Sequence, residues 1–418
     1  WQSPMFSTLY SIYYYSFFFV YSSTILLVLC RSGWGPIPRW FLSILDVING
    51  RKEEEEGPIL FEKKSLISSV IENGKEKEGE KLFAVSLSLA GNGIASIIRD
   101  DMMLGMVHPP STLDLLTSKS RHLSTQILHY IGLLFRLGFL FPLRVLFMAS
   151  GLLFAIGSSF IVLLYPGVTR ETLLYFTITF GRLFNVTIGL VPQVHNKKHR
   201  PKYSGIAVAN HLTANDIMTI YCECDEIGYT ITGQKHGGFI YPLELLGDKL
   251  SPTLWLDRSC YKDRAAFQKL VLDYASQPST YPVLMFPEGF CSNNQTVLQF
   301  RKGVFGGDVP FYPIALKQQT RFGDSFWLEN TYLPYLLRCM ISWALVVRIT
   351  YLPQMRREEN ESSEDFAKRV QNAIANYLER PASPYDGSMK RPADRLLYSQ
   401  KLKSSIARVF DAQIDSSE

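Results

Sequence analysis

The stretch GIAVANHLTAND, residues 205–216, joins a short apolar run to a group of polar residues. Its first part, residues 205–209, is typical of a buried β-strand because it is short and apolar. His211 and Asp216 follow directly after it. Similar apolar runs alternate with helix-length stretches further along the chain: the runs cover 282–286, 313–316 and 344–347, and the stretches cover 262–275 and 363–378. This alternation predicts an α/β domain whose functional side chains gather where strands end.

His211 and Asp216 are spaced as a possible catalytic pair. In one uninterrupted helix, residues five positions apart point about 140° away from each other, so these side chains could not meet. They can meet if His211 lies in the loop after the strand and Asp216 lies in the first turn of a helix. The carboxylate would then hold one imidazole nitrogen and leave the other to take a proton from a hydroxyl. The alternative is a surface histidine followed by a helix-capping aspartate.

Three further blocks contain residues suited to a phosphate-bearing polyol. In the block 286–289, a carboxylate stands beside a glycine at a strand end, although an ordinary turn has the same composition. Arg258, Lys262 and Arg264 offer cations for a phosphate, or form a solvated helix start. The block 309–313, which ends in Pro313, would shape a pocket wall or simply end a loop.

Together these four blocks resemble the glycerolipid acyltransferase family, whose marks are a His-x4-Asp box, an Arg-bearing block, a Phe-Pro-Glu-Gly block and a Pro-containing block. Residues 140–392 are similar to the endoplasmic-reticulum glycerol-3-phosphate acyltransferases of animals. That similarity rests on several stretches, among them Leu143-Arg144-Val145, 233–238, 286–294, Lys302-Gly303 and 322–327. The chain departs from the family pattern at Leu212, Asn215 and Phe290.

The resemblance implies a mixed α/β sheet flanked by helices, with transmembrane helices before it. It also implies transfer of an acyl group from acyl-CoA to the sn-1 hydroxyl of glycerol-3-phosphate, without a metal or an organic cofactor. The roles it implies are His211 as general base, Asp216 as its orienting partner, Arg258 at the acceptor phosphate with Lys262 and Arg264 beside it, Glu288 and Gly289 at the glycerol, and Pro313 in the acceptor pocket. A lysophospholipid acyltransferase and a catalytically inactive membrane scaffold are the alternatives.

The distribution of charge predicts the domain organisation. Residues 1–30 and 145–165 carry no charge and are long enough to cross a bilayer as helices. The predicted divisions are a membrane anchor at 1–30, a charged and partly disordered linker at 31–124, a transmembrane segment or membrane hairpin at 125–166 that is interrupted near Pro142, a catalytic domain at 167–380 and a polar tail at 381–418.

Composition limits the compartment and the partners. The net charge of +5 is dispersed without a continuous basic stripe, which excludes a typical nucleic-acid binder. Six cysteines in 418 residues form neither a disulfide framework nor a zinc-ligand pattern, so we expect reduced thiols. The expected partners are acyl-CoA, glycerol-3-phosphate and a lipid bilayer. Since both substrates are made in the cytosol, we expect the catalytic domain to face it from the endoplasmic-reticulum membrane.

Overall fold

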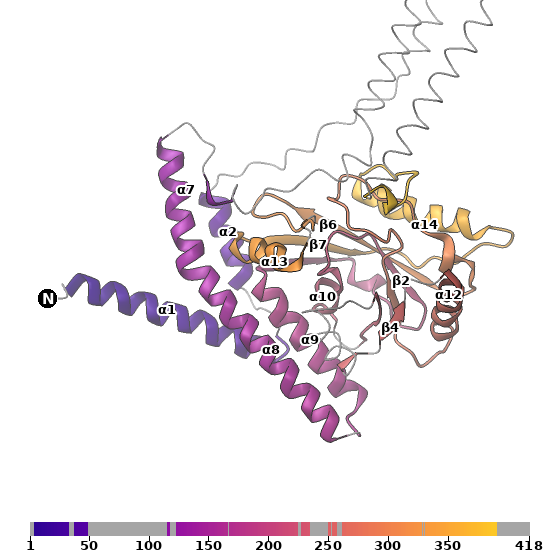
Figure 1. Ribbon diagram of the computed structural model, residues 1–418, viewed down its shortest axis with the longest axis horizontal. Helices are drawn as coiled ribbons and strands as arrows, with labels where there is room; N and C mark the ends of the chain where they lie inside the picture. Colours follow the sequence, from indigo (N-terminus) through magenta and orange to yellow (C-terminus); the bar gives the residue numbers. More distant parts are fainter. Residues whose placement is uncertain are drawn as a thin grey trace, which may run out of the picture.

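The structure is a computed structural model in which a group of apolar helices packs against an α/β domain (Figure 1). It describes residues 4–32, 37–48, 115–117, 123–165, 167–224, 227–234, 250–251, 253–256, 261–327, 329 and 331–390. The side chains of residues 4, 48, 234, 255–256, 261–264 and 389–390 lie outside the description.

A seven-stranded sheet forms the centre of the domain, in the order β1-β7-β6-β2-β5-β3-β4. The strands from β6 to β4 run parallel to one another, β7 runs antiparallel to β6, and β1 runs parallel to β7. The sheet is therefore mixed, which confirms the predicted fold class. The strands are β1 (Leu190–His195), β2 (Ile206–Ala209), β3 (Thr230–Gln234), β4 (Thr253–Leu256), β5 (Val283–Met285), β6 (Phe311–Gln319) and β7 (Leu345–Tyr351).

Helices cover both faces of the sheet because its central strands are apolar on both sides. In β2, Ala207 and Ala209 pack with the cluster beneath α9 and α10, whereas Ile206 and Val208 pack with the cluster beneath α12 and α14. α13 packs on the same side as α9. The bounds are α9 (Arg170–Thr187), α10 (Asp216–Tyr221), α12 (Tyr261–Ala275), α13 (Tyr332–Ile341) and α14 (Ser363–Leu378).

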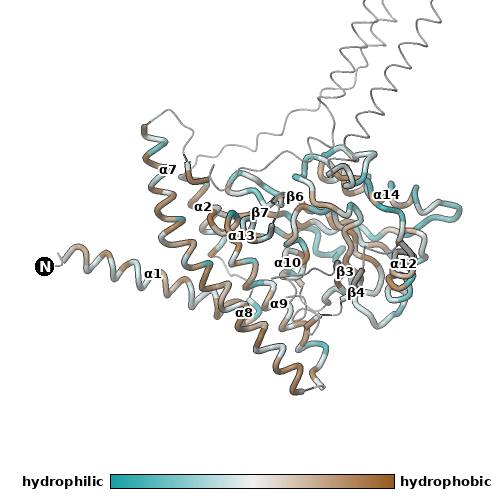
Figure 2. Tube along the Cα trace, in the orientation of Figure 1, coloured by the Kyte–Doolittle hydropathy of each residue, from teal (hydrophilic) through white to brown (hydrophobic). Residues whose placement is uncertain are grey.

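Two helices are long and apolar enough to cross a membrane by length and composition: Met5–Leu29, within α1 (Pro4–Leu29), and Leu123–Leu164. The second consists of α7 (Leu123–Phe135), a π-helical segment η1 (Arg136–Leu140) and α8 (Phe141–Leu164). In Figure 2 the helix from α7 to α8 is largely hydrophobic, whereas α1 alternates between hydrophobic and paler positions.

Of the two alternatives for 125–166, the structure does not show a hairpin with a break at Pro142, because the chain continues through it as one 42-residue helix. Pro142 lies in the first turn of α8, directly after the π-helical segment, and such local adjustments accommodate proline within apolar helices. At about 1.5 Å per residue the helix is ~63 Å long, roughly twice the thickness of a bilayer core. A helix of this length that crossed a bilayer would extend beyond the hydrocarbon.

Arg144 joins this helix to the α/β domain. Its side chain is buried and donates to the backbone oxygens of Met340 at 2.7 Å, Ser342 at 2.5 Å and Trp343 at 2.8 Å, where α13 ends. Carbonyls at a helix end have no partner within the helix, so a guanidinium satisfies them well. Arg144 thereby fixes the position of α13 relative to α8.

Two predicted domain boundaries need correction. Residues 37–48, assigned to a charged linker, form the helix α2, whose Leu42 and Leu45 pack against Val191 of β1 and Val346 of β7. The tail assigned from 381 onward also belongs to the domain as far as it is described, because 381–390 exchanges backbone hydrogen bonds with Val297. The rest of the predicted linker, at 33–36, 49–114 and 118–122, and the tail beyond 390 lie outside the described residues.

Candidate functional site

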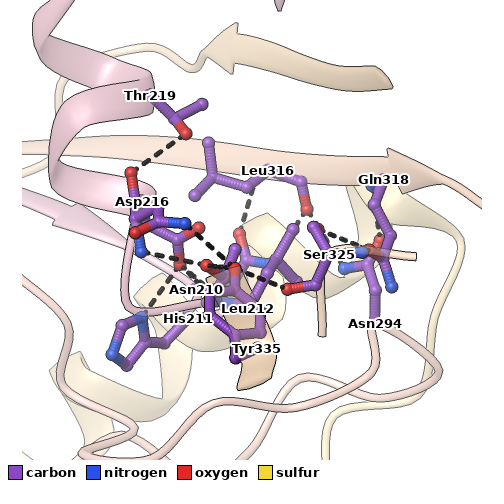
Figure 3. Close-up of polar contacts among 12 residues, drawn as sticks. Asn210, His211, Leu212, Asp216, Thr219, Asn294, Leu316, Gln318, Ser325 and Tyr335 are labelled. Carbon is purple, nitrogen blue, oxygen red and sulfur yellow. Dashed lines mark hydrogen bonds and ion pairs between the residues drawn. The ribbon is translucent and has the colours of Figure 1, made fainter. Parts of the chain in front are cut away.

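The His-x4-Asp box places its two ionisable side chains in contact. His211 lies in the loop after β2, and Asp216 is the first residue of α10. His211 Nδ1 stands 2.9 Å from Asp216 Oδ2 (Figure 3). The predicted meeting of a loop histidine with an aspartate in the first helical turn is confirmed. Because a carboxylate accepts, Nδ1 carries the proton in this pair and Nε2 is left as the basic nitrogen.

The backbone holds Asp216 in place. Its Oδ2 also accepts hydrogen bonds from the backbone N–H groups of Leu212, at 2.7 Å, and Thr213, at 3.0 Å. Both N–H groups belong to the loop between β2 and α10. Asp216 therefore holds the loop after β2 and orients the imidazole. The N-cap of α10 is Asn215, which makes no side-chain capping bond within the described chain, so the alternative of a surface histidine and a helix-capping aspartate is not what the structure shows.

Two tyrosines of α13 explain the unusual Asn215 within the box. Tyr332 donates to Asn215 Oδ1 at 2.7 Å, and the Asn215 side-chain amide donates to the Tyr335 hydroxyl at 3.1 Å. The Tyr335 hydroxyl also lies 2.6 Å from the hydroxyl of Thr213. Since α13 is fixed by Arg144, this network connects the box to the long apolar helix.

The imidazole ring is held on its face as well as its edge. The ring of Phe286, from the Phe-Pro-Glu-Gly block, stacks on His211 with 4.5 Å between centroids and 23° between planes. Burial works to lower the pKa of His211, but the nearby Cys291 thiol and the Asp216 carboxylate outweigh it, and the pKa lies well above its usual value. A base of this kind binds a proton readily once its neutral form is present.

Glu288 lies fully buried close to the pair. Burial raises its pKa well above the ordinary range, and the neighbouring Asp216 charge raises it further. The charge of His211 and the backbone groups of His211 and Leu298 act to lower the pKa but do not offset this rise. Within the described chain, neither carboxyl oxygen of Glu288 has a hydrogen-bond partner of normal geometry. A buried carboxyl without partners costs free energy, so a donor that reached it would be bound favourably.

Gly289 forms the turn beside Glu288 with a φ of +70°, a conformation that favours glycine. The guanidinium carbon of Arg301 lies 2.9 Å from the position that a β-carbon at Gly289 would occupy. Arg301 is half exposed, pairs with Asp386 at 3.4 Å and lies over the ring of Phe290. Sequence reasoning missed Arg301 and Asp386. The available signal for Arg301 was its position directly before Lys302-Gly303, which belongs to the matched stretches.

A ladder of side-chain amides joins the first and third blocks to β6 (Figure 3). Asn210 donates to the Leu316 backbone oxygen at 2.9 Å and accepts from its N–H at 2.8 Å. Asn294 donates to the same oxygen at 3.1 Å and accepts from the backbone N–H of Gln318. The side-chain oxygen of Gln318 in turn accepts from Ser325. These bonds satisfy buried amides and hold the loops of His211 and Glu288 beside each other.

The remaining predicted site residues either lie outside the description or lie within the sheet. Arg258 lies outside the described residues, and Lys262 and Arg264 lie in the first turn of α12 with their side chains outside the description. Pro313 is buried inside β6, in register with Val208. It therefore lies within the sheet, below the strand end where His211 stands, and its place in an acceptor pocket stays a prediction. Among the described residues, no three His, Cys, Asp or Glu side chains are grouped as metal ligands.

A protein-family model matches the part of the chain that contains the pair. The family model described as Acyltransferase matches residues 191–317, which contain the His-Asp pair, Glu288 and Gly289. The match covers less than half of the chain and shows a similarity of this segment to acyltransferases.

The chain is also similar to individual curated proteins. The chain is 36% identical over 220 residues to glycerol-3-phosphate acyltransferase 3 of Xenopus laevis, covering 52% of this chain and 49% of the relative. It is 37% identical over 240 residues to glycerol-3-phosphate acyltransferase 3 of Danio rerio, covering 56% and 53%. It is 40% identical over 199 residues to glycerol-3-phosphate acyltransferase 4 of Mus musculus, covering 47% and 43%. The chain thus matches about half the length of these relatives.

Among solved structures, the 1-acyl-sn-glycerophosphate acyltransferase PlsC of Thermotoga maritima is similar with a TM-score of 0.36 and 17% identity, covering 56% of this chain and 96% of that one.

Proposed function

We propose that this chain transfers an acyl group from acyl-CoA to the sn-1 hydroxyl of glycerol-3-phosphate, giving lysophosphatidic acid and free CoA. The observation that carries the proposal is the 2.9 Å contact between His211 Nδ1 and Asp216 Oδ2 within a segment that is similar to acyltransferases. The names of the curated relatives support the choice of acceptor.

The chemistry follows from the free imidazole nitrogen. His211 Nε2 takes the proton of the acceptor hydroxyl, and the hydroxyl oxygen attacks the thioester carbonyl carbon. The C–S bond then breaks, and the CoA thiolate takes the proton back from the imidazolium. Asp216 holds the ring in orientation throughout and stabilises its positive charge. General-base assistance of this kind contributes on the order of 10²–10⁴ in rate.

The acceptor is held, in this proposal, by Glu288 and by cations around Gly289. A glycerol hydroxyl would supply a donor that the Glu288 oxygens otherwise lack. Because Glu288 is fully buried, that contact requires the loop at 286–292 to shift as the acceptor enters. Arg301, half exposed beside Gly289, would bind the phosphate together with the predicted Arg258.

The proposed location is the endoplasmic-reticulum membrane with the α/β domain in the cytosol, where both substrates are made. The two long apolar helices suggest membrane association. The basic run that includes Lys197, Lys198 and Lys202 would then lie near anionic headgroups. Asn360 begins a glycosylation sequence at a position where the chain is exposed. A glycan on Asn360 in cells would place the domain in the lumen and contradict this topology.

The test is a membrane-fraction assay with labelled glycerol-3-phosphate or lysophosphatidic acid, each with and without acyl-CoA. We expect acyl-CoA-dependent labelling of lysophosphatidic acid from glycerol-3-phosphate, and its loss in His211→Ala but not in the matched control His199→Ala. Preferential use of lysophosphatidic acid as acceptor would replace the proposal by a lysophospholipid acyltransferase. No transfer to either acceptor by folded protein would leave the inactive scaffold.

A further inference from the structure

A cavity of about 460 Å³ lies between α2 and the β1–β7–β6 side of the sheet, and it shares no residue with the His211 site. Its size falls in the range of small-ligand sites. Three guanidinium groups and one carboxylate contribute to its wall, giving two net positive charges. The residues lining it are Arg39, Leu42, Ser43, Asp46, Gln193, Gln319, Arg321, Phe322 and Arg348.

The floor of this arginine cavity is formed by polar side chains of the sheet, namely Gln193, Gln319 and Arg348. Gln193 of β1 is in register with Arg348 of β7, and Arg348 is in register with Lys317 of β6. Alternation along β7 places Arg348 on the same face as Val346, which packs beneath α2. Polar residues in the middle of paired strands, under a packed helix, are unusual unless something polar is bound there.

The arginine side chains of the cavity differ in their hydrogen-bond partners. Arg321 pairs with Asp46 at 2.8 Å, which holds α2 onto the loop after β6. Arg348 Nε is buried without a hydrogen-bond partner among the described residues. A buried donor without a partner is costly, and a phosphate oxygen is the acceptor that a guanidinium fits best.

The outer face of α2 indicates where that phosphate comes from. Trp40, Ile44 and Val47 are spaced along one side of the helix and are 63%, 57% and 83% exposed. A helix with an apolar outer stripe and a basic residue beside it is typical of one that lies in a bilayer interface, where tryptophan is favoured.

Aromatic contacts lead from α2 to the long apolar helix. The ring of Trp343 lies 6.5 Å from that of Phe41 on α2 and 6.1 Å from that of Phe135 on α7. Figure 1 shows α2 between α7 and the sheet. The arginine cavity therefore lies beside the segment most suited to a membrane, with the exposed stripe on the helix that covers it.

We propose that the arginine cavity binds the phosphate headgroup of an anionic phospholipid, separately from the acceptor site. Arg39 and Arg348 bind the phosphate, and Trp40, Ile44 and Val47 rest among the acyl chains. The site does not depend on the proposed reaction, since none of its residues belongs to the catalytic pair or to the Glu288 block.

The experiment is native mass spectrometry of the purified full chain in detergent, titrated with phosphatidic acid or with phosphatidylcholine. We expect phosphatidic acid to bind at least tenfold more tightly. Arg39→Ala should weaken its binding about tenfold or more, the size expected for one charge-assisted hydrogen bond. Arg356→Ala, which removes an exposed arginine paired with Asp308, is the matched control and should bind as the wild type does.

Further variants separate the possible ligands and guard against misfolding. Arg348→Gln tests the floor, and because Arg39 is exposed, Arg39→Glu remains informative if the Arg348 variant fails to fold. Trp40→Ser should weaken phosphatidic acid binding. Equal binding of both lipids, or unchanged binding in both Arg39 variants, would overturn the proposal. If millimolar inorganic phosphate displaced the lipid and Trp40→Ser left lipid binding unchanged, the cavity would be a site for soluble anions. That result would overturn the assignment to a lipid.

Discussion

Arg301 lies across Gly289, with its guanidinium carbon 2.9 Å from where a β-carbon would stand. Two features therefore require glycine at this position: its φ of +70° and the guanidinium that packs against it. The pair brings a positive charge to the turn that carries Glu288. Asp386 holds the guanidinium from the other side at 3.4 Å, so the segment 381–390 helps to build the site.

Arg301→Ala should raise the KM for glycerol-3-phosphate about tenfold or more, because one charge-assisted hydrogen bond to phosphate is worth about 1.5–3 kcal/mol. The KM for acyl-CoA should change much less. Arg301→Lys should recover part of the effect, since a point charge remains without the bidentate geometry. Lys302→Ala is the control, because Lys302 is exposed and pairs with Glu364. Equal changes in both KM values would contradict a role at the acceptor.

Asp216→Asn should lower kcat by a factor on the order of 10²–10⁴, since the imidazole loses its anionic partner. It should also move the acidic limb of the pH–rate profile to lower pH. The wild-type limb reports the His211 pKa, which lies above 6.5, and loss of the carboxylate removes one of the two influences that raise it. The measurement is kcat/KM from pH 5 to 9, with thermal unfolding to check the fold. An unshifted limb would show that another group titrates.

Glu288→Gln should change how stability depends on pH. The pKa of Glu288 is raised in the folded state above 4.5, so between that value and the raised one the folded chain binds more protons than the unfolded chain. The wild type therefore loses up to about 1.4 kcal/mol per pH unit across this interval as pH rises, and the amide variant escapes this loss.

The difference in Tm between Glu288→Gln and the wild type should grow in favour of the variant as pH rises above 4.5, with no such trend below it. Thermal unfolding at a series of pH values in one detergent measures this. A difference that stays constant with pH would mean that the Glu288 carboxyl is ionised in the fold.

Gly189→Ala should destabilise the chain by at least about 1–2 kcal/mol. Gly189 has a φ of +67°, and a β-carbon there would displace the Arg144 guanidinium from the carbonyls after α13. Gly157→Ala in α8 is the matched control, because no described atom outside its own stretch of helix lies within 4 Å of its added carbon and alanine favours a helix. Heating followed by size-exclusion chromatography compares the two. Equal behaviour would remove Arg144 as the junction between α8 and α13.

The sequence alone predicted the features that depend on neighbours along the chain. The bounds of α14, 363–378, were predicted from its pattern, and in the structure Ser362 caps its start. The strand before His211 and the meeting of His211 with Asp216 also follow from short-range spacing. A break at Pro142 was predicted from the same kind of local rule and failed, because a π-helical segment accommodates the proline.

The tertiary structure decided what joins residues distant along the chain. Arg301 and Asp386 are 85 positions apart, and Asn215 lies 117 and 120 positions from the tyrosines that hold it. Gln193 and Arg348 meet only because β1 pairs with β7. Spacing along a helix or strand fixes the direction of side chains within one element, so a sequence reveals a pair such as His211 and Asp216. Which elements pack together depends on burial of apolar surface summed over the whole domain, and that sum is what brings Arg301 to Gly289 and α2 to the sheet.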